Sequence, residues 1–110
     1  MSNEVLQTLL DRARAAQAAY AVFDQAQVDA IVRAMAKVVY DNAEELAKMA
    51  IDETRMGIYE DKVAKNKGKS KVIWNDLKDK KSIGILRVLE EEGIVEVAKP
   101  MGVIGAVAPT

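Results

Sequence analysis

The chain has 110 residues, of which half are apolar, and its 16 Lys and Arg residues nearly balance its 17 Asp and Glu residues, which gives a net charge of -1. This length allows one domain at most, and this charge favours neither an acidic nor a basic partner. The sequence contains no cysteine and no histidine. Within these residues, this composition excludes disulfides, a thiol nucleophile and a histidine base or metal ligand.

Apolar residues recur three or four positions apart between Asn3 and Tyr20, and most charged residues fall outside that stripe. The spacing predicts an amphipathic helix. Asn3 is the predicted N-cap, and Glu4 would interact favourably with the helix dipole. We expect this helix to face a core, with docking to a partner as the alternative.

A second helix start stands at Asp24, whose side chain can form a capping box with Gln27. One apolar face continues from there to about Arg55. The stretch Asp41–Glu44 resembles a second N-terminal cap and predicts a break near Tyr40. Gly57 is the predicted residue that ends the helical region.

A third helix is predicted over residues 59–77, with a thin apolar face and five lysines: Lys62, Lys65, Lys67, Lys69 and Lys71. A lysine cluster can contact nucleic acid, an anionic ligand or a neighbouring subunit. The segment contains no arginine. We interpret the lysines as a solvated face, keep an anionic ligand or subunit contact as the alternative, and expect no nucleic-acid partner.

The periodicity changes after residue 81. Residues 83–89 and 94–97 read as two strands, and Glu90–Gly93 reads as the turn between them. Together they predict a β-hairpin. A two-stranded hairpin is marginally stable alone, so we expect a third strand or a partner to support it.

The last stretch begins at Pro100 and is almost entirely apolar. Val103–Val107 predicts a fully buried strand of a parallel sheet. Such a strand needs neighbours and crossover helices, so we expect the chain to be the beginning of a larger α/β protein, or a remnant of one. The Gly102–Gly105 stretch lacks the third glycine of a dinucleotide fingerprint, but Ala108–Thr110 follows the carboxyl end of the strand, where open α/β sheets bind ligands.

Two stretches, Lys48–Asn66 and Ala98–Thr110, resemble CoA-acylating aldehyde dehydrogenases, including the N-terminal half of bifunctional aldehyde-alcohol dehydrogenases. The first contains Met-Gly at 56–57, followed by Glu-Asp-Lys at 60–62 and Lys-Asn at 65–66. The resemblance spans essentially the whole chain. It implies an α/β fold in which residues 1–110 form the N-terminal part of an aldehyde dehydrogenase domain. In that assignment residues 3–81 are mostly helical, 83–97 form a hairpin of the interdomain or oligomerisation region, and 100–110 form the first strand of the NAD-binding sheet.

The resemblance also implies a reaction, in which an aldehyde, CoA and NAD+ give acyl-CoA and NADH. The expected substrate is acetaldehyde or another short aldehyde, with NAD as cofactor, CoA as co-substrate and a homo-oligomer as the assembly. In this family a cysteine attacks the aldehyde, and NAD carries the redox chemistry. The residues implied to line the NAD site are Val107, Ala108, Pro109 and Thr110.

The chain departs from the family pattern because it contains no cysteine. No catalytic residue and no metal ligand are therefore assigned, and these residues alone are expected to be inactive. The opening shows no secretory signal and no apolar run reaches the ~20 residues of a membrane span, so we expect a cytoplasmic protein with no membrane contact. The alternative is a non-catalytic helical interaction module, or a degenerate fragment that binds its parent enzyme.

Overall fold

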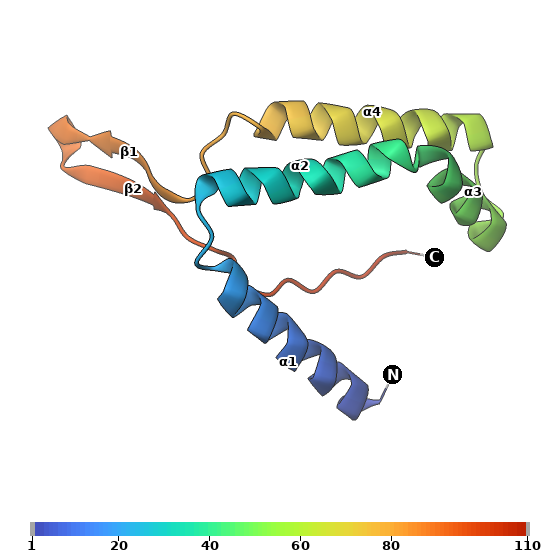
Figure 1. Cartoon of the computed structure of the whole chain (residues 1–110), viewed down its shortest axis with the longest axis horizontal. Helices are drawn as coiled ribbons and strands as arrows, with labels where there is room; N and C mark the ends of the chain where they lie inside the picture. The colour runs from blue at the N-terminus through green and yellow to red at the C-terminus, as the bar shows by residue number, and fades with distance from the viewer. Residues whose placement is uncertain (1, 110) are drawn as a thin grey trace. The chain divides into compact units, whose positions relative to one another are not determined.

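The computed structural model describes residues 2–109, which form helices α1 to α4, strands β1 and β2, and a short 3-10 helix, η1, between the strands (Figure 1). The described residues divide into two compact units. One unit contains residues 2–25 and 82–109, and the other contains residues 26–81.

In the first unit, α1 (Asn3–Tyr20) has the predicted extent, but its cap lies one residue earlier than predicted. The Ser2 hydroxyl accepts a hydrogen bond from the Val5 N–H at 3.3 Å. Ser2 has the extended backbone of an N-cap, so Asn3 is already the first helical residue. Asn3 as the cap was therefore wrong, because a serine directly before it can take the same role.

The second unit begins with α2 (Gln25–Asp41), whose first residue belongs to the first unit, and continues with α3 (Ala43–Thr54). The predicted break is confirmed and falls at Asn42, whose side-chain amide donates to the Val38 carbonyl at 2.8 Å. The predicted extent to about Arg55 is confirmed, but Gly57 is not the residue that ends the helix. α3 ends at Arg55, which takes the left-handed conformation with φ 57°, while Gly57, with φ 88°, lies in the turn that follows.

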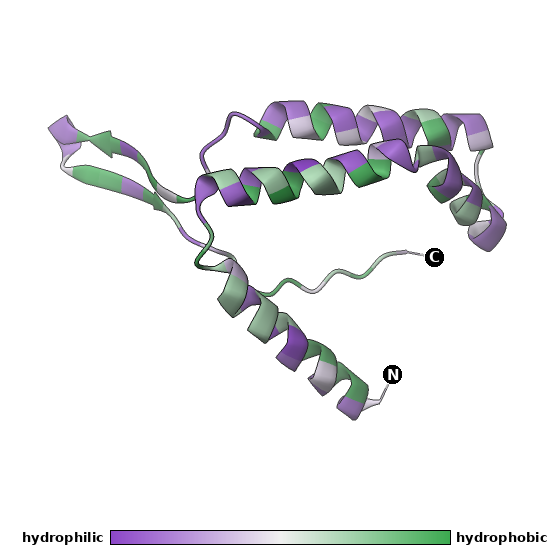
Figure 2. Cartoon of the chain, viewed as in Figure 1, coloured by the Kyte–Doolittle hydropathy of each residue, from purple (hydrophilic) through white to green (hydrophobic). Residues whose placement is uncertain are grey.

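Helix α4 (Tyr59–Leu77) has the predicted bounds and packs against α3. Ala43 and Ala47 are 1% and 0% exposed. The Asn66 side-chain amide donates to the Ala43 carbonyl at 3.2 Å, and Lys67 forms an ion pair with Glu44 at 3.9 Å. Figure 2 shows how much of α4 is hydrophilic, so small buried alanines and these polar contacts hold the helix pair together.

The predicted hairpin is confirmed. Strands β1 (Gly84–Leu89) and β2 (Ile94–Ala98) pair antiparallel and are joined by η1 (Glu90–Glu92) and Gly93, which has φ 65°. The register shifts between Ile85 and Arg87, which marks a bulge.

The Gln25 side chain holds the beginning of the hairpin segment. Its Oε1 accepts hydrogen bonds from the backbone N–H groups of Ser82 and Ile83, at 2.8 and 3.1 Å. Its amide nitrogen donates to the Ser82 hydroxyl at 3.0 Å. One side chain therefore connects two positions that are 57 residues apart in the sequence.

The predicted buried strand over Val103–Val107 is not formed. The sheet in the described residues contains only β1 and β2, and residues 99–109 have no regular secondary structure. Ile104 is 73% exposed and Val107 is 99% exposed. A parallel strand requires a hydrogen-bonding neighbour, and here the two available strands pair with each other.

Candidate functional site

The residues predicted to line a cofactor site lie at the end of the described chain. Val107, Ala108 and Pro109 are consecutive and exposed, and Thr110 lies outside the described residues. Within residues 2–109 they line none of the hollows described below. The structure therefore presents them as an open apolar surface rather than as an enclosed site.

The base of this segment lies against α1. A hollow of about 400 Å³ is lined by Ala13, Ala16 and Tyr20 from α1 and by Val103 and Ile104 from the segment, together with Gln17 and Gly102. Val103 is 43% exposed, whereas Val107 is almost fully exposed. Helix α1 therefore supports the beginning of the segment but not the predicted cofactor residues.

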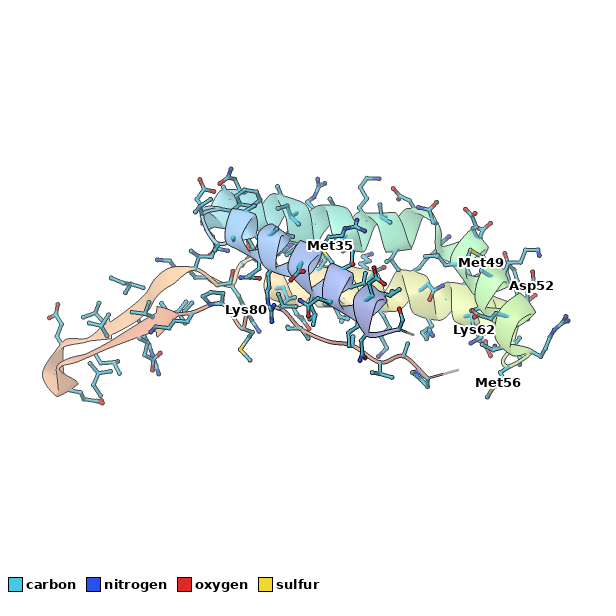
Figure 3. The ribbon with its side chains drawn as sticks, turned by 90° about the horizontal axis from the view of Figure 1, so that it is seen from below. Met35, Met49, Asp52, Met56, Lys62 and Lys80 are labelled. Atoms are coloured by element: carbon cyan, nitrogen blue, oxygen red, sulfur yellow. The ribbon has the colours of Figure 1, made fainter. Side chains whose placement is uncertain are left out.

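The second unit contains a seam between α2 and α4, which lie side by side in two views (Figures 1 and 3). Ala36 of α2 and Ser70 of α4 line hollows on both sides of this seam. The two hollows differ in chemistry. The first, of about 400 Å³, has mainly apolar walls with lysines among them: Val32, Met35, Val39, Ile73, Lys65 and Lys69. Figure 3 labels Met35, which is 66% exposed.

The second hollow, of about 330 Å³, is lined by cations and aromatic rings: Arg33, Lys37, Lys71, Tyr40 and Trp74, with Asp41 as the single carboxylate. Lys37 forms an ion pair with Asp41 on the same helix. Sequence reasoning considered Lys71 and Trp74 but missed Arg33, Lys37 and Tyr40. The available signal was the i, i+4 and i+7 spacing of these three residues, which places them on one side of α2.

The α4 lysines do not form one uniform face. Lys67 lies 6.0 Å from the centre of the Tyr40 ring and pairs with Glu44. Lys65 and Lys69 line the apolar hollow, and Lys71 lines the cationic one. Lys65, Lys69 and Lys71 are exposed, which agrees with the predicted solvated face, whereas Lys67 is half-buried and contacts residues of α2 and α3.

Two exposed ion pairs shift the pKa values of their side chains. The Arg87 guanidinium donates two hydrogen bonds to the Glu96 carboxylate, at 2.5 and 2.6 Å, and so holds the pKa of Glu96 below its usual range. The Asp52 carboxylate beside Lys48 raises the pKa of that ammonium group. Both pairs are contacts on exposed surfaces, and neither lines one of the three hollows described above.

Residues 2–109 contain no group of three or more potential metal-ligating side chains that could hold an ion. No helix in the same range is both long and apolar enough to cross a membrane. The chain contains no cysteine and no histidine, so no thiol nucleophile and no imidazole base lies within these residues.

No protein-family model matches the chain. It is 53% identical over 110 residues to the succinate-semialdehyde dehydrogenase (acetylating) of Clostridium kluyveri, which covers 99% of this chain and 24% of the relative. It is 45% identical over 105 residues to the bifunctional aldehyde-alcohol dehydrogenase AdhE of Escherichia coli, covering 96% of this chain and 12% of that enzyme.

Comparison with solved structures also finds an aldehyde dehydrogenase. The crystal structure of a probable aldehyde dehydrogenase from Listeria monocytogenes superposes with a TM-score of 0.81 at 42% identity, covering 86% of this chain and 21% of the other. The resemblance to CoA-acylating aldehyde dehydrogenases and to their N-terminal regions is therefore confirmed. The chain spans a quarter or less of the length of these relatives.

Proposed function

We propose that this chain, which resembles CoA-acylating aldehyde dehydrogenases over nearly its whole length, supplies the N-terminal segment of an NAD-dependent enzyme of that kind. The observation that carries the proposal is the agreement of sequence and backbone along almost every element. The reaction converts an aldehyde, CoA and NAD+ into acyl-CoA and NADH. Acetaldehyde or another short aldehyde is the proposed substrate, and the proposed compartment is the cytoplasm.

Residues 100–110 are proposed as the first strand of the NAD-binding sheet, with Val107, Ala108, Pro109 and Thr110 as one wall of the cofactor site. Residues 103–109 are exposed and belong to no strand, which supports this assignment. Their backbone N–H and C=O groups can therefore form hydrogen bonds with a neighbouring strand. Val107, Ala108 and Pro109 carry no charge and fit an apolar ring or ribose surface better than a pyrophosphate. NAD supplies the hydride acceptor when bound, and its phosphates require residues outside this segment.

The hairpin is proposed as a contact within a homo-oligomer. Ile85 pairs with Val97 and Val88 pairs with Val95, and the alternation of side chains along β2 places both pairs on one face. These four side chains are 51–54% exposed. An apolar face of this kind on a two-stranded ribbon requires cover, and a second subunit or the rest of the enzyme provides it.

The test combines intact mass with activity. The protein that carries this sequence is purified from its natural host, weighed by mass spectrometry and assayed for NADH formation from acetaldehyde or succinate semialdehyde with NAD+ and CoA. We expect a mass well above 12.0 kDa and NADH formation that requires CoA. A compact folded protein of 12.0 kDa without activity would contradict the proposal.

The second candidate function is a non-catalytic interaction module, or a degenerate fragment that binds its parent enzyme. The exposed apolar side chains of α1 and the hairpin favour it as well, because they would suit a partner surface. The two functions differ in outcome: the module predicts a stable, monodisperse 110-residue protein that binds no NAD.

A further inference from the structure

The cationic hollow on the α2–α4 seam collects positive charge from two helices. Arg33 and Lys37 come from α2, and Lys71 comes from α4. Asp41 is the single carboxylate on its lining, and it already pairs with Lys37. Among residues 2–109, Arg33 and Lys71 form no ion pair or side-chain hydrogen bond. Two uncompensated cations therefore face one hollow.

Aromatic rings lie in the same hollow. Tyr40 is 41% exposed, and Trp74 is half-buried and is the sole tryptophan of the chain. Lys67 lies over the Tyr40 ring, so Trp74 is the better platform for a planar ligand. Stacking of a nucleobase on an aromatic side chain contributes favourably to binding regardless of the base. An aromatic platform beside unpaired cations matches a ligand that has a flat ring and an anionic group.

We propose that this hollow binds a nucleotide, with the base stacked on Trp74 and the phosphates held by Arg33 and Lys71. Its volume of about 330 Å³ lies in the range of small-molecule sites. Guanidinium and ammonium groups are the usual protein partners of phosphate oxygens. None of the lining residues belongs to the 107–110 segment, so the inference goes beyond the proposed function and does not depend on it.

The test uses Trp74 as a reporter, and a Trp74→Phe variant separates its fluorescence from that of any tryptophan elsewhere in the enzyme. ATP is titrated into the protein while Trp74 fluorescence is followed with excitation at the red edge of the indole band. We expect saturable quenching that weakens as salt is raised, because the phosphate contacts are exposed. Adenosine should bind more weakly than ATP. Inorganic triphosphate should compete with ATP without quenching, since it carries no ring.

Variants distinguish this hollow from other nucleotide sites. Arg33→Ala and Lys71→Ala should each weaken ATP binding about fivefold, as expected for one exposed phosphate contact. Lys65→Ala removes the same charge from α4 but on the apolar side of the seam, and should change binding less than twofold. Circular dichroism checks that each variant is folded.

Three results would overturn the proposal: no saturable quenching by ATP, quenching that salt does not weaken, or equal losses in Lys65→Ala and Lys71→Ala. The salt titration and the competition by triphosphate use the unmodified protein, so they decide the question even where a variant does not fold. The measurement contains neither aldehyde nor CoA, and a negative enzyme assay leaves its result unaffected.

Discussion

Two glycines of the second unit have opposite structural roles. Gly57 takes φ 88° in the turn before α4, and a Cβ there would lie 2.7 Å from the Cε atom of Lys62. Gly68 lies inside α4, and a Cβ there would meet no atom within 4 Å. The first glycine therefore meets a conformational requirement, whereas the second only weakens its helix.

Gly57→Ala should lower the free energy of unfolding by about 1–2 kcal/mol, because alanine is strained at positive φ even after the flexible Lys62 side chain moves away. Gly68→Ala should raise it by roughly 0.5–1 kcal/mol, since alanine favours a helix interior. Urea unfolding followed by circular dichroism measures both. The same sign of change in the two variants would contradict this account.

The Arg87–Glu96 pair predicts a pH dependence of the hairpin. Because Arg87 lowers the pKa of Glu96 in the folded state, its contribution to stability is present above the unfolded-state pKa and is lost as pH falls through the folded-state value. The NMR chemical shifts of the β1 and β2 amides should indicate a larger fraction of open hairpin at acidic pH than at neutral pH. Glu96→Gln serves as the control, and its hairpin should lose most of that pH dependence. An equal response in both proteins would disprove the assignment.

At the scale of elements, the α3–α4 contact depends on small side chains. Ala43 and Ala47 are fully buried where the helices meet. Ala47→Leu should destabilise the protein by about 1–3 kcal/mol, because added methylenes at a tight helix contact force the backbones apart. Ala34→Leu, at an exposed position of α2, is the matched control and should change stability little. Thermal melts of the two variants give the comparison, and equal melting temperatures would refute the packing argument.

Elements defined by local patterns were predictable from the sequence. Helix α4 and the hairpin follow from apolar periodicity and turn residues, which act between near neighbours. The strand over 103–107 was not predictable in the same way, because a buried parallel strand depends on other strands. The caps differ from the predicted ones, since Ser2 rather than Asn3 caps α1 and Arg55 rather than Gly57 ends α3.

The candidate sites show the same division. The apolar character of Val107–Pro109 is visible in the sequence, but its openness depends on which elements surround it. Arg33 and Trp74 lie on different helices, and no spacing rule connects them. Only the packing of α2 beside α4 places them in one hollow. Sequence alone therefore identified single residues of that site but not the site.

At the scale of the whole molecule, apolar surface is the dominant feature. In residues 2–109 only Val28, Ala43 and Ala47 are buried apolar residues, whereas many large apolar side chains are exposed. The 110-residue chain alone should therefore self-associate, with an average mass that rises with concentration in sedimentation velocity.

The hairpin face is the expected contact in this self-association. Replacing Val88 and Val95 together by lysine should reduce it, because charge is costly to bury in an apolar contact. Met56→Lys, at a 63% exposed position of the α3–α4 turn, should leave association unchanged and serves as the control. Monodisperse behaviour of the unmodified chain at all concentrations would instead favour the interaction module.

The hydrogen bonds of Gln25 to Ser82 and Ile83 also have a consequence during synthesis. A ribosome makes Gln25 first and reaches its partner 57 residues later, which corresponds to roughly 3–11 s at ordinary elongation rates. In that interval α2, α3 and α4 are synthesised in order, as one continuous stretch of the chain. The unit that contains both ends of the described chain cannot form these contacts until then, so the apolar side chains of α1 are exposed to chaperones while the ribosome is still translating.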